Sequence, residues 1–418
     1  MATLLPIDLS RRELLASVLA SAVSGRRPPN IIVIVADDLG YGEPGCQGDL
    51  EIPTPHIDSI AANGVRFTVG YVTAPLCSPS RAGFMTGRYQ TRFGHELNAI
   101  AEQNADPRIG LPLSEITIAD ALKKAGYATG AIGKWHLGGA PHFHPQRRGF
   151  DEFFGFTHEG HFFVPAPYTG LTSYLIPLVP PYDLGNPIYR GDTPVEEKAY
   201  LTEAFCREAV SFVDRHRQQP FFLYLAFNAV HHPMQSPPKY MARVAKIKDP
   251  LRRILGGMLV AMDDAVGELL EKLRAAGLEE NTLIFFYSDN GAYALENATS
   301  NKPLRGFKSQ LWEGGIRVPF LLQWKGKLPG GVTYSEPVSA LDVFPTAVAA
   351  AGGRLPSDRI LDGVNLLPYL EGRKTEPPHE QLYWRLQGNT ALRCGKWKLI
   401  RQANPRQKGD FQLFDLEN

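Results

Sequence analysis

The chain has 418 residues, 44% of them hydrophobic and 21% charged, which is enough apolar material for a large folded core. Its 44 Lys and Arg residues balance 43 Asp and Glu residues, so the charge indicates neither a nucleic-acid surface nor an acidic tail. No apolar run approaches the roughly 20 residues of a membrane-spanning helix, and we therefore expect no membrane insertion.

Residues 1–27 come first and differ in pattern from the rest. A Ser-Arg-Arg sequence at residues 10–12 precedes an apolar run at residues 14–23, which ends in small residues. The pattern resembles a twin-arginine export signal, with an ordinary amphipathic N-terminal helix as the alternative. We expect export to the periplasm or the outside, by a route that carries folded proteins.

Four apolar runs rich in β-branched or aromatic residues each end abruptly at polar residues. Runs of this length are typical of strands buried on both faces of a parallel sheet. They cover residues 30–36, 127–132, 220–227 and 282–287. Helical patterns occupy residues 117–125, 196–216 and 251–276, and Thr117 and Asp120 are placed like a capping box. This alternation predicts an α/β fold, a doubly wound mixed, mostly parallel sheet flanked by helices.

The pattern changes near the end of the chain. A helix is predicted around residues 341–351, followed by a connection rich in Gly and Pro. Short strand-like pieces then predict a small antiparallel sheet, at residues 382–386, 391–393, 396–401 and 411–414. We therefore divide the chain into a main domain over residues 28–374 and a C-terminal antiparallel subdomain over residues 375–418.

Oxygen-bearing side chains follow two of the predicted strands. Asp37 and Asp38 come after the first strand, and Asp289 and Asn290 after the fourth. In a doubly wound sheet ligands bind beyond the carboxyl ends of the strands, so these residues are expected to be neighbours in space. Such a set favours calcium or magnesium over zinc. Each pair taken alone could instead be a helix cap or a turn.

The segment from Cys77 to Arg88 carries the most specific pattern in the chain. The four cysteines, Cys46, Cys77, Cys206 and Cys394, lack the spacing of a zinc site and the density of a disulfide framework. A buried free thiol is the default for such a cysteine. The segment nevertheless matches the sulfatase signature C-x-P-S-R-x-x-x-x-T-G at every fixed position. A formylglycine-generating enzyme reads this signature and oxidises the cysteine to an aldehyde.

The chain thus resembles the formylglycine-dependent type I sulfatases, of the arylsulfatase and N-acetylgalactosamine-sulfatase kind within the alkaline phosphatase superfamily. The resemblance covers residues 29 to 417 in the family order and would make residues 28–374 the catalytic domain. The other matching segments are residues 30–42, 52–58, 133–138, 288–291, 303–308 and 312–319.

The resemblance implies a role for each polar cluster. Formylglycine at Cys77, hydrated to a geminal diol, would attack sulfur with one hydroxyl while one calcium ion draws charge from the oxygens. His231 would protonate the leaving alcohol oxygen, and His136 would take the proton of the second hydroxyl and so expel sulfate. The remaining negative charge would be held by Arg81, Lys134 and Lys308. The implied calcium ligands are Asp37, Asp38, Cys77, Asp289 and Asn290.

The sequence departs from the family pattern at three places. The family usually has Pro before and Thr after the position of His231, where this chain has Val230 and His232, so His232 competes for the acid role. The loop at residues 153–161 lies where sulfatases often contact substrate, and His161 is our candidate there. The chain stops at Asn418, where the family continues into a terminal helix, and we expect a truncated C-terminal subdomain with an exposed edge.

These observations predict an exported sulfatase acting on sulfated sugars, with aryl sulfates as artificial substrates and a formylglycine-generating enzyme as its partner. Two alternatives stay open. One is a phosphonate monoester or phosphodiester hydrolase, which shares the fold and the formylglycine. The other is a non-catalytic protein that binds sulfated glycans, which would apply if Cys77 is never modified.

Overall fold

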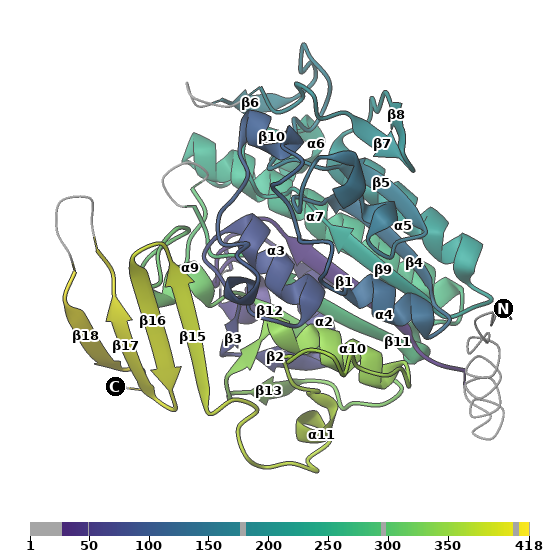
Figure 1. Ribbon diagram of the computed structural model, residues 1–418. Coiled ribbons are helices and arrows are strands. Elements are labelled where there is room, and N and C mark those ends of the chain that lie inside the picture. Colours follow the sequence, from purple (N-terminus) through teal and green to yellow (C-terminus); the bar gives the residue numbers. More distant parts are fainter. Residues whose placement is uncertain (1–26, 49, 176–180, 294–297, 404–408, 418) are drawn as a thin grey trace, which may run out of the picture.

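Parallel strands form the centre of the protein. The computed structural model describes residues 27–48, 50–175, 181–293, 298–403 and 409–417. Five strands pair in the order β11 (Thr282–Ser288), β1 (Asn30–Ala36), β9 (Phe221–Ala226), β4 (Ala128–Lys134) and β5 (Glu152–Phe156), each parallel to its neighbour (Figure 1). All their residues are buried except Ala128 and Glu152 at two strand starts. The four predicted runs are confirmed as strands, and their carboxyl ends meet at one edge of the sheet.

Short strands extend the sheet on both sides and make it mixed. One side adds β12 (Phe320–Gln323), antiparallel to β11, then β2 (Val65–Phe67) and β13 (Val332–Tyr334). The other side adds β7 (Ile188–Arg190) and β8 (Thr193–Val195), both antiparallel. Within the described residues the sheet has ten strands, which confirms the predicted fold class. The added strands span only three or four residues each, too few for an apolar period to reveal them.

Helices cover both faces of the sheet, and strand β1 shows why. Ile31, Val33 and Val35 belong to one core, with α3 (Cys77–Thr86), α4 (Ile118–Lys124) and α10 (Val343–Ala350). Ile32 and Ile34 belong to the other, with α2 (Pro55–Ala62), α5 (Leu201–His216), α6 (Pro238–Arg243) and α7 (Pro250–Ala275). Since successive side chains of a strand point to opposite faces, an unbroken apolar run is what two covered faces require.

The predicted helices agree with the structure at most of their ends. The Thr117 hydroxyl accepts from the Asp120 amide, and the Asp120 carboxylate accepts from the Thr117 amide, so the capping box of α4 is confirmed. Helix α7 lies within one residue of its predicted ends. Helix α5 begins at Leu201 rather than at residue 196, because the Glu197 side chain accepts from the Ala199 amide in a turn before the helix.

The last part of the chain forms the predicted antiparallel sheet. Its strands are β15 (Gln381–Leu386), β16 (Asn389–Cys394), β17 (Trp397–Arg401) and β18 (Phe411–Asp415). The Trp384 indole donates to the Val72 carbonyl at 2.7 Å, and the buried Lys398 ammonium lies 2.7 Å from the Glu313 carboxylate. Trp384 and its neighbours also join the apolar core of the main sheet. The small sheet is therefore fixed to the main domain by buried contacts.

The remaining elements are short. They are the two-stranded sheets β10 (Met234–Ser236) with β6 (Thr172–Tyr174) and β14 (Val338–Ser339) with β3 (Gly70–Tyr71), the helices α9 (Glu313–Ile316) and α11 (Leu367–Leu370), and the 3-10 turns η1 (Gly45–Gln47), η2 (Gln90–Arg92), η3 (Ala101–Ala105), η4 (Pro141–Phe143), η5 (Pro145–Arg147), η6 (Glu279–Asn281) and η7 (Ala340–Asp342).

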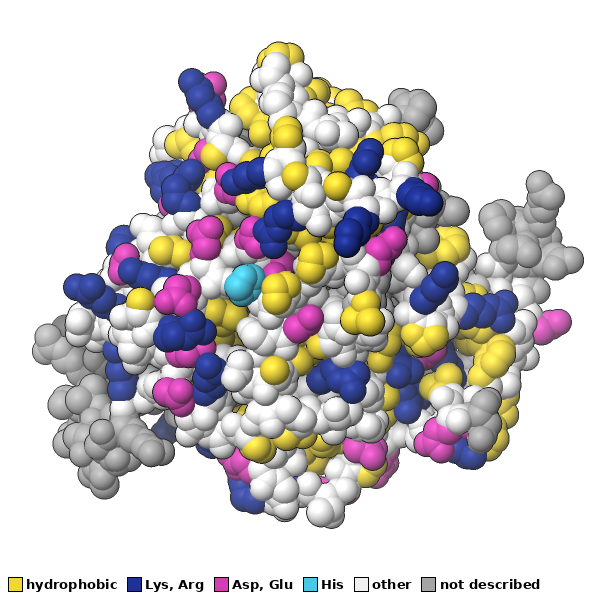
Figure 2. All heavy atoms as spheres, turned by 180° about the vertical axis from the view of Figure 1, so that it is seen from behind, with side chains coloured by type: hydrophobic (Ala, Val, Ile, Leu, Met, Phe, Trp, Pro, Cys, Tyr) yellow, Lys and Arg dark blue, Asp and Glu magenta, His cyan; other side chains and the backbone are white. Residues whose placement is uncertain are grey.

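The expectations about membrane insertion, the export signal and surface charge can be compared with the structure. In the part of the chain that the structure describes, no helix is both long and apolar enough to cross a membrane. The export signal expected at residues 1–27 lies outside the described residues, apart from Arg27. Figure 2 shows acidic and basic side chains interspersed over one face, in keeping with a formal net charge of +1.

Candidate active site

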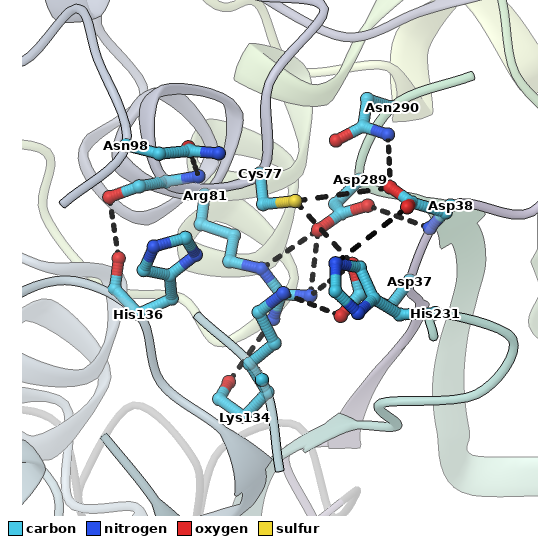
Figure 3. Close-up of polar contacts among 12 residues, drawn as sticks. Asp37, Asp38, Cys77, Arg81, Asn98, Lys134, His136, His231, Asp289 and Asn290 are labelled. Carbon is cyan, nitrogen blue, oxygen red and sulfur yellow. Dashed lines mark hydrogen bonds and ion pairs between the residues drawn. The ribbon is translucent and has the colours of Figure 1, made fainter. Parts of the chain in front are cut away.

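The polar residues that follow the central strands converge at one buried cluster (Figure 3). Asp37 and Asp38 come directly after β1, Asp289 after β11, and Lys134 is the last residue of β4. His231 lies five residues beyond the end of β9. All of these side chains are buried. The shared edge of the parallel strands therefore brings together residues that are up to about 250 positions apart in sequence, as predicted.

Cys77 is the first residue of helix α3 and lies over the acidic residues. Its Sγ is 3.5 Å from Asp37 Oδ1 and 3.9 Å from Asp38 Oδ1. Burial raises the pKa of the Cys77 thiol far above its usual range, although Lys134 and Lys308 act in the opposite direction. An unmodified Cys77 is therefore a protonated thiol, and the thiolate rather than the thiol is the nucleophile of cysteine chemistry.

Three cations pair with the three carboxylates of the cluster. Lys134 Nζ lies 2.6 Å from Asp37 Oδ2, and Lys308 Nζ lies 2.7 Å from Asp38 Oδ1. The Arg81 guanidinium lies 2.7 Å from Asp289 Oδ2. Among these described residues the formal charges cancel. A divalent cation added to the cluster would therefore leave it positive and suited to an anionic substrate.

Arg81 is fixed by more than its ion pair. Its Nη1 donates to the Lys134 carbonyl at 3.1 Å and to the Tyr224 hydroxyl at 3.0 Å, while Nε donates to Asp289 at 2.9 Å. Burial alone would lower the pKa of Arg81, but Tyr224 and the carboxylates raise it above the usual range. The guanidinium thus remains charged and is held in one orientation at the base of the cluster.

The donor set fits a hard divalent cation. One ligand atom each from Asp37, Asp38, Cys77 and Asp289 lie within 4.8 Å of one another. Asn290 Nδ2 donates to Asp38 at 2.7 Å, while its buried Oδ1 has no hydrogen-bond partner in the described part of the chain. Turning this amide about its axis would present Oδ1 to the carboxylates as a fifth donor. Burial and the neighbouring Asp37 raise the pKa of Asp289, a cost that a bound cation would relieve.

His136 has one ring nitrogen engaged and one available. Its Nε2 lies 3.1 Å from the Ala99 carbonyl, so Nε2 carries a proton and Nδ1 holds a lone pair. Nδ1 is buried and has no hydrogen-bond partner among the residues that the structure describes. Burial, followed by the charge of Lys134, lowers the pKa of His136 well below its usual value. Its backbone has φ +53°, a left-handed conformation that costs about 1–3 kcal/mol in a residue other than glycine.

The adjacent histidines His231 and His232 have different surroundings. His231 Nε2 is 3.8 Å from Asp38 Oδ2, and its Nδ1 is 2.5 Å from the His232 carbonyl. His232 Nε2 is instead 2.7 Å from the Tyr182 hydroxyl. The two rings stack with centroids 4.5 Å apart. Burial lowers both pKa values, well below the usual range for His231 and to about 4 for His232. The His231 ring therefore faces the acidic cluster, and the His232 ring bonds the 181–186 segment.

His161 lies apart from these residues. Its Nδ1 is 2.7 Å from the Phe162 carbonyl and 3.2 Å from Asp183, and its ring packs against Phe156. These partners do not belong to the acidic cluster. A substrate contact at His161 stays a prediction.

Ser78, His95 and Asn98 are among the residues of the site that were not singled out from the sequence. Asn98 Oδ1 accepts from the Ser78 amide at 2.9 Å, at the first turn of α3. Ser78 Oγ donates to the His136 carbonyl at 2.5 Å and is 2.6 Å from His95 Nε2. Ser78 sits at a variable position of the Cys77 signature, and His95 and Asn98 lie in a loop without any strand or helix pattern. Only the folded structure reveals that Ser78 contacts His136, and that His95 and Asn98 both contact Ser78.

Comparison with known proteins agrees with this arrangement. The sulfatase family model matches residues 29–353. The N-acetylgalactosamine-6-sulfatase of Mus musculus is 37% identical over 392 residues, covering 90% of this chain and 72% of that protein. The steryl-sulfatase of Mus musculus is 36% identical over 453 residues, covering 92% of this chain and 71% of that protein.

A solved structure is similar over nearly the whole chain. The crystal structure of Ps i-CgsB in complex with k-i-k-neocarrahexaose has a TM-score of 0.85 and 39% identity, covering 94% of this chain and 87% of that one. Together with the match at residues 29–353 and the cluster around Cys77, these likenesses show that the chain belongs to the sulfatase family and is a sulfuric ester hydrolase.

Proposed function

We propose that this chain hydrolyses sulfate esters of sugars, with an aldehyde made from Cys77 and one bound calcium ion. The observation that carries the proposal is the position of the Cys77 sulfur, 3.5 Å from Asp37 Oδ1 at the start of α3. There it lies among three carboxylates and three cations. A formylglycine-generating enzyme would supply the aldehyde by oxidising the Cys77 side chain.

Calcium is the metal that this donor set fits best. Asp37, Asp38, Asp289 and Asn290 would hold it together with the modified Cys77, and all of their donors are oxygens. When bound, calcium would draw negative charge from the sulfate oxygens.

The three cations of the cluster would bind the sulfate group. The ammonium groups of Lys134 and Lys308 each pair with a carboxylate that would bind the metal. When the metal takes these carboxylates, both ammonium groups can bind sulfate oxygens instead. Arg81 is held by Asp289 and Tyr224 and keeps its charge in place. In a buried site each such donor is worth on the order of 3 kcal/mol of barrier.

The histidine tautomers support two separate proton roles. Since His136 Nε2 faces a carbonyl, Nδ1 is the atom that can accept a proton. Since His231 Nδ1 also faces a carbonyl, Nε2 is the atom that takes up a proton and passes it to the leaving alcohol oxygen. His232 Nε2 is engaged by Tyr182, which favours His231 over His232 as the acid.

The sugar class rests on the likenesses. Several similar proteins are named N-acetylgalactosamine-6-sulfatase, and the solved structure at 39% identity holds a neocarrahexaose. Steryl-sulfatases are similar to almost the same degree, so a sterol sulfate is the competing substrate to test.

One experiment tests the reaction. The chain, produced with a formylglycine-generating enzyme, is digested, and the mass of the Cys77 peptide is measured. Turnover of an aryl sulfate is followed with calcium and with chelator, beside the Cys77→Ala variant. A peptide lighter by the difference between thiol and aldehyde, with calcium-dependent turnover that Cys77→Ala lacks, is the expected result.

Further arms separate the alternatives. Sulfated N-acetylgalactosamine oligosaccharides are compared with steryl sulfate, and aryl sulfate with aryl phosphonate and phosphodiester. Complete modification with turnover of phosphonates or phosphodiesters alone would refute the sulfatase reaction. An unmodified chain that still binds sulfated glycans would indicate a binding protein.

A further inference from the structure

The Ser78 hydroxyl connects the segment that carries Cys77 to His136, and the proposed reaction needs these two residues in a fixed relative position. Ser78 belongs to the first turn of α3, directly after Cys77. Its Oγ donates to the backbone carbonyl of His136 at 2.5 Å. One hydroxyl therefore links the helix that carries the nucleophile to the residue that offers a free ring nitrogen.

Proton counting fixes the direction of the next bond. The His136 carbonyl can only accept, so the single Ser78 hydroxyl proton points to it. His95 Nε2, 2.6 Å from Ser78 Oγ, must then carry a proton and donate to that oxygen. Burial lowers the pKa of His95 to about 4, so the neutral ring has its one proton on Nε2 and donates none to the Gly110 carbonyl, which lies 3.1 Å from Nδ1. The chain of contacts thus runs from His95 through Ser78 to His136.

The backbone of His136 needs such an anchor. Its φ of +53° is unfavourable for a side-chain-bearing residue and persists only where surrounding contacts hold it. The amide of His136 is held by the Thr157 carbonyl at 3.2 Å, and its carbonyl by Ser78. Without the Ser78 bond, the His136 carbonyl would lose this anchor, and the contact of Nε2 with the Ala99 carbonyl would be left to hold the ring.

We propose that Ser78 and His95 are positioning residues that hold His136 at the correct distance from Cys77. The inference rests on the proposed function, because it gives His136 the role of proton acceptor. Ser78 and His95 act through the His136 backbone, so their loss should lower kcat through misplacement of the His136 ring.

The test is a double-mutant cycle on the full-length protein, with an aryl sulfate as substrate. Ser78→Ala should lower kcat about 10- to 100-fold, with KM changed less than about threefold. Ser78→Thr keeps the hydroxyl and should restore kcat. His95→Phe, which removes both ring nitrogens, should give a loss of the same kind.

The decisive comparison is with His136→Ala. If Ser78 acts through His136, the Ser78→Ala/His136→Ala double variant should be no slower than His136→Ala. A second loss that multiplies the first would overturn the proposal, as would a Ser78→Ala variant with wild-type kcat. Thr129→Val is the matched control, since it removes a buried hydroxyl from β4, on the strand that leads to His136, and should leave kcat unchanged.

Two further measurements keep the outcomes distinct. The mass of the Cys77 peptide is measured for each variant, because Ser78 lies in the segment that the formylglycine-generating enzyme reads. His95 lies outside that segment, so if Ser78→Ala is not modified, the kcat of His95→Phe tests the positioning role. Should the modified wild type fail to cleave aryl sulfates, the proposed function fails. The imidazole NMR signals of His136 then test positioning alone, and signals unchanged in both Ser78→Ala and His95→Phe would refute it.

Discussion

The ion pair between Lys134 and Asp37 allows a test of how positive and negative charges balance in the proposed metal-binding cluster. Both side chains are fully buried, and the Lys134 ammonium lies 2.6 Å from the carboxylate. Lys134→Met keeps the length of the side chain and removes its charge. The carboxylate then loses its nearest cation, and breaking a buried pair in this way costs about 3–5 kcal/mol.

This cost translates into a measurable shift of the melting temperature. At about 2.1 cal/mol/K per residue, the unfolding entropy of 418 residues is roughly 0.9 kcal/mol/K, so the melting temperature should fall by about 3–6 °C in chelator. Calcium should raise the melting temperature of Lys134→Met by more than that of the wild type, because the variant cluster carries one more uncompensated negative charge.

Lys398→Met provides the matched control. Lys398 is also buried and lies 2.7 Å from Glu313, but in the C-terminal sheet. Its loss should cost similar stability, and calcium should not restore it. Differential scanning calorimetry with and without calcium measures both variants. A Lys134→Met protein as stable as the wild type in chelator, or rescued by calcium no better than Lys398→Met, would refute the reasoning.

Three more predictions follow from the described contacts. His231→Gln should lower kcat on an unactivated sugar sulfate by about 100-fold or more, and His232→Gln by less than about tenfold, since only the His231 ring faces the cluster; equal losses would contradict this. His379 is partly buried, which by itself would lower its pKa, but the charge and hydrogen bond of Asp342 raise it. The stability lost in His379→Gln should therefore be greatest below about pH 6.5 and should vanish as pH rises through the folded-state pKa. Calorimetry across pH 5 to 9 that finds a constant difference would refute this. Thr117→Val removes the acceptor of the α4 capping box and should cost about 1 kcal/mol in urea unfolding, whereas Thr117→Ser should cost much less.

The central strands were predictable from sequence because their physical demands are local. A strand covered on both faces is apolar along nearly its whole length, and residues 31–36 and 283–287 are apolar throughout, after a polar Asn30 and Thr282 at the two strand starts. The edge strands are missing from the prediction for the opposite reason. Residues 65–67 and 188–190 are short, and pairing with their neighbours, rather than their own composition, makes them strands.

The residues of the site also fall into those that were predictable from sequence and those that were not. Asp37 and Asp289 follow strong strand signals, so topology alone placed them together. The choice between His231 and His232 could not be made from sequence, since it depends on which ring the Tyr182 hydroxyl engages. Ser78 contacts His136 through its backbone carbonyl, and a bond to a carbonyl places no requirement on the identity of the residue that carries it.

The contacts of the C-terminal sheet have a consequence for how the protein unfolds. Glu313, at the start of α9, takes its buried cation from Lys398 in β17, and the Leu311 amide donates to the Gln402 side chain at 2.8 Å. Leu311 and Glu313 lie just after Lys308 in sequence, so contacts with the C-terminal sheet stabilise the loop that bears this lysine. Melting of the small sheet would expose buried charge in the main domain. We therefore expect heat to disrupt the small sheet and the Lys308 loop cooperatively, in one transition that also ends activity.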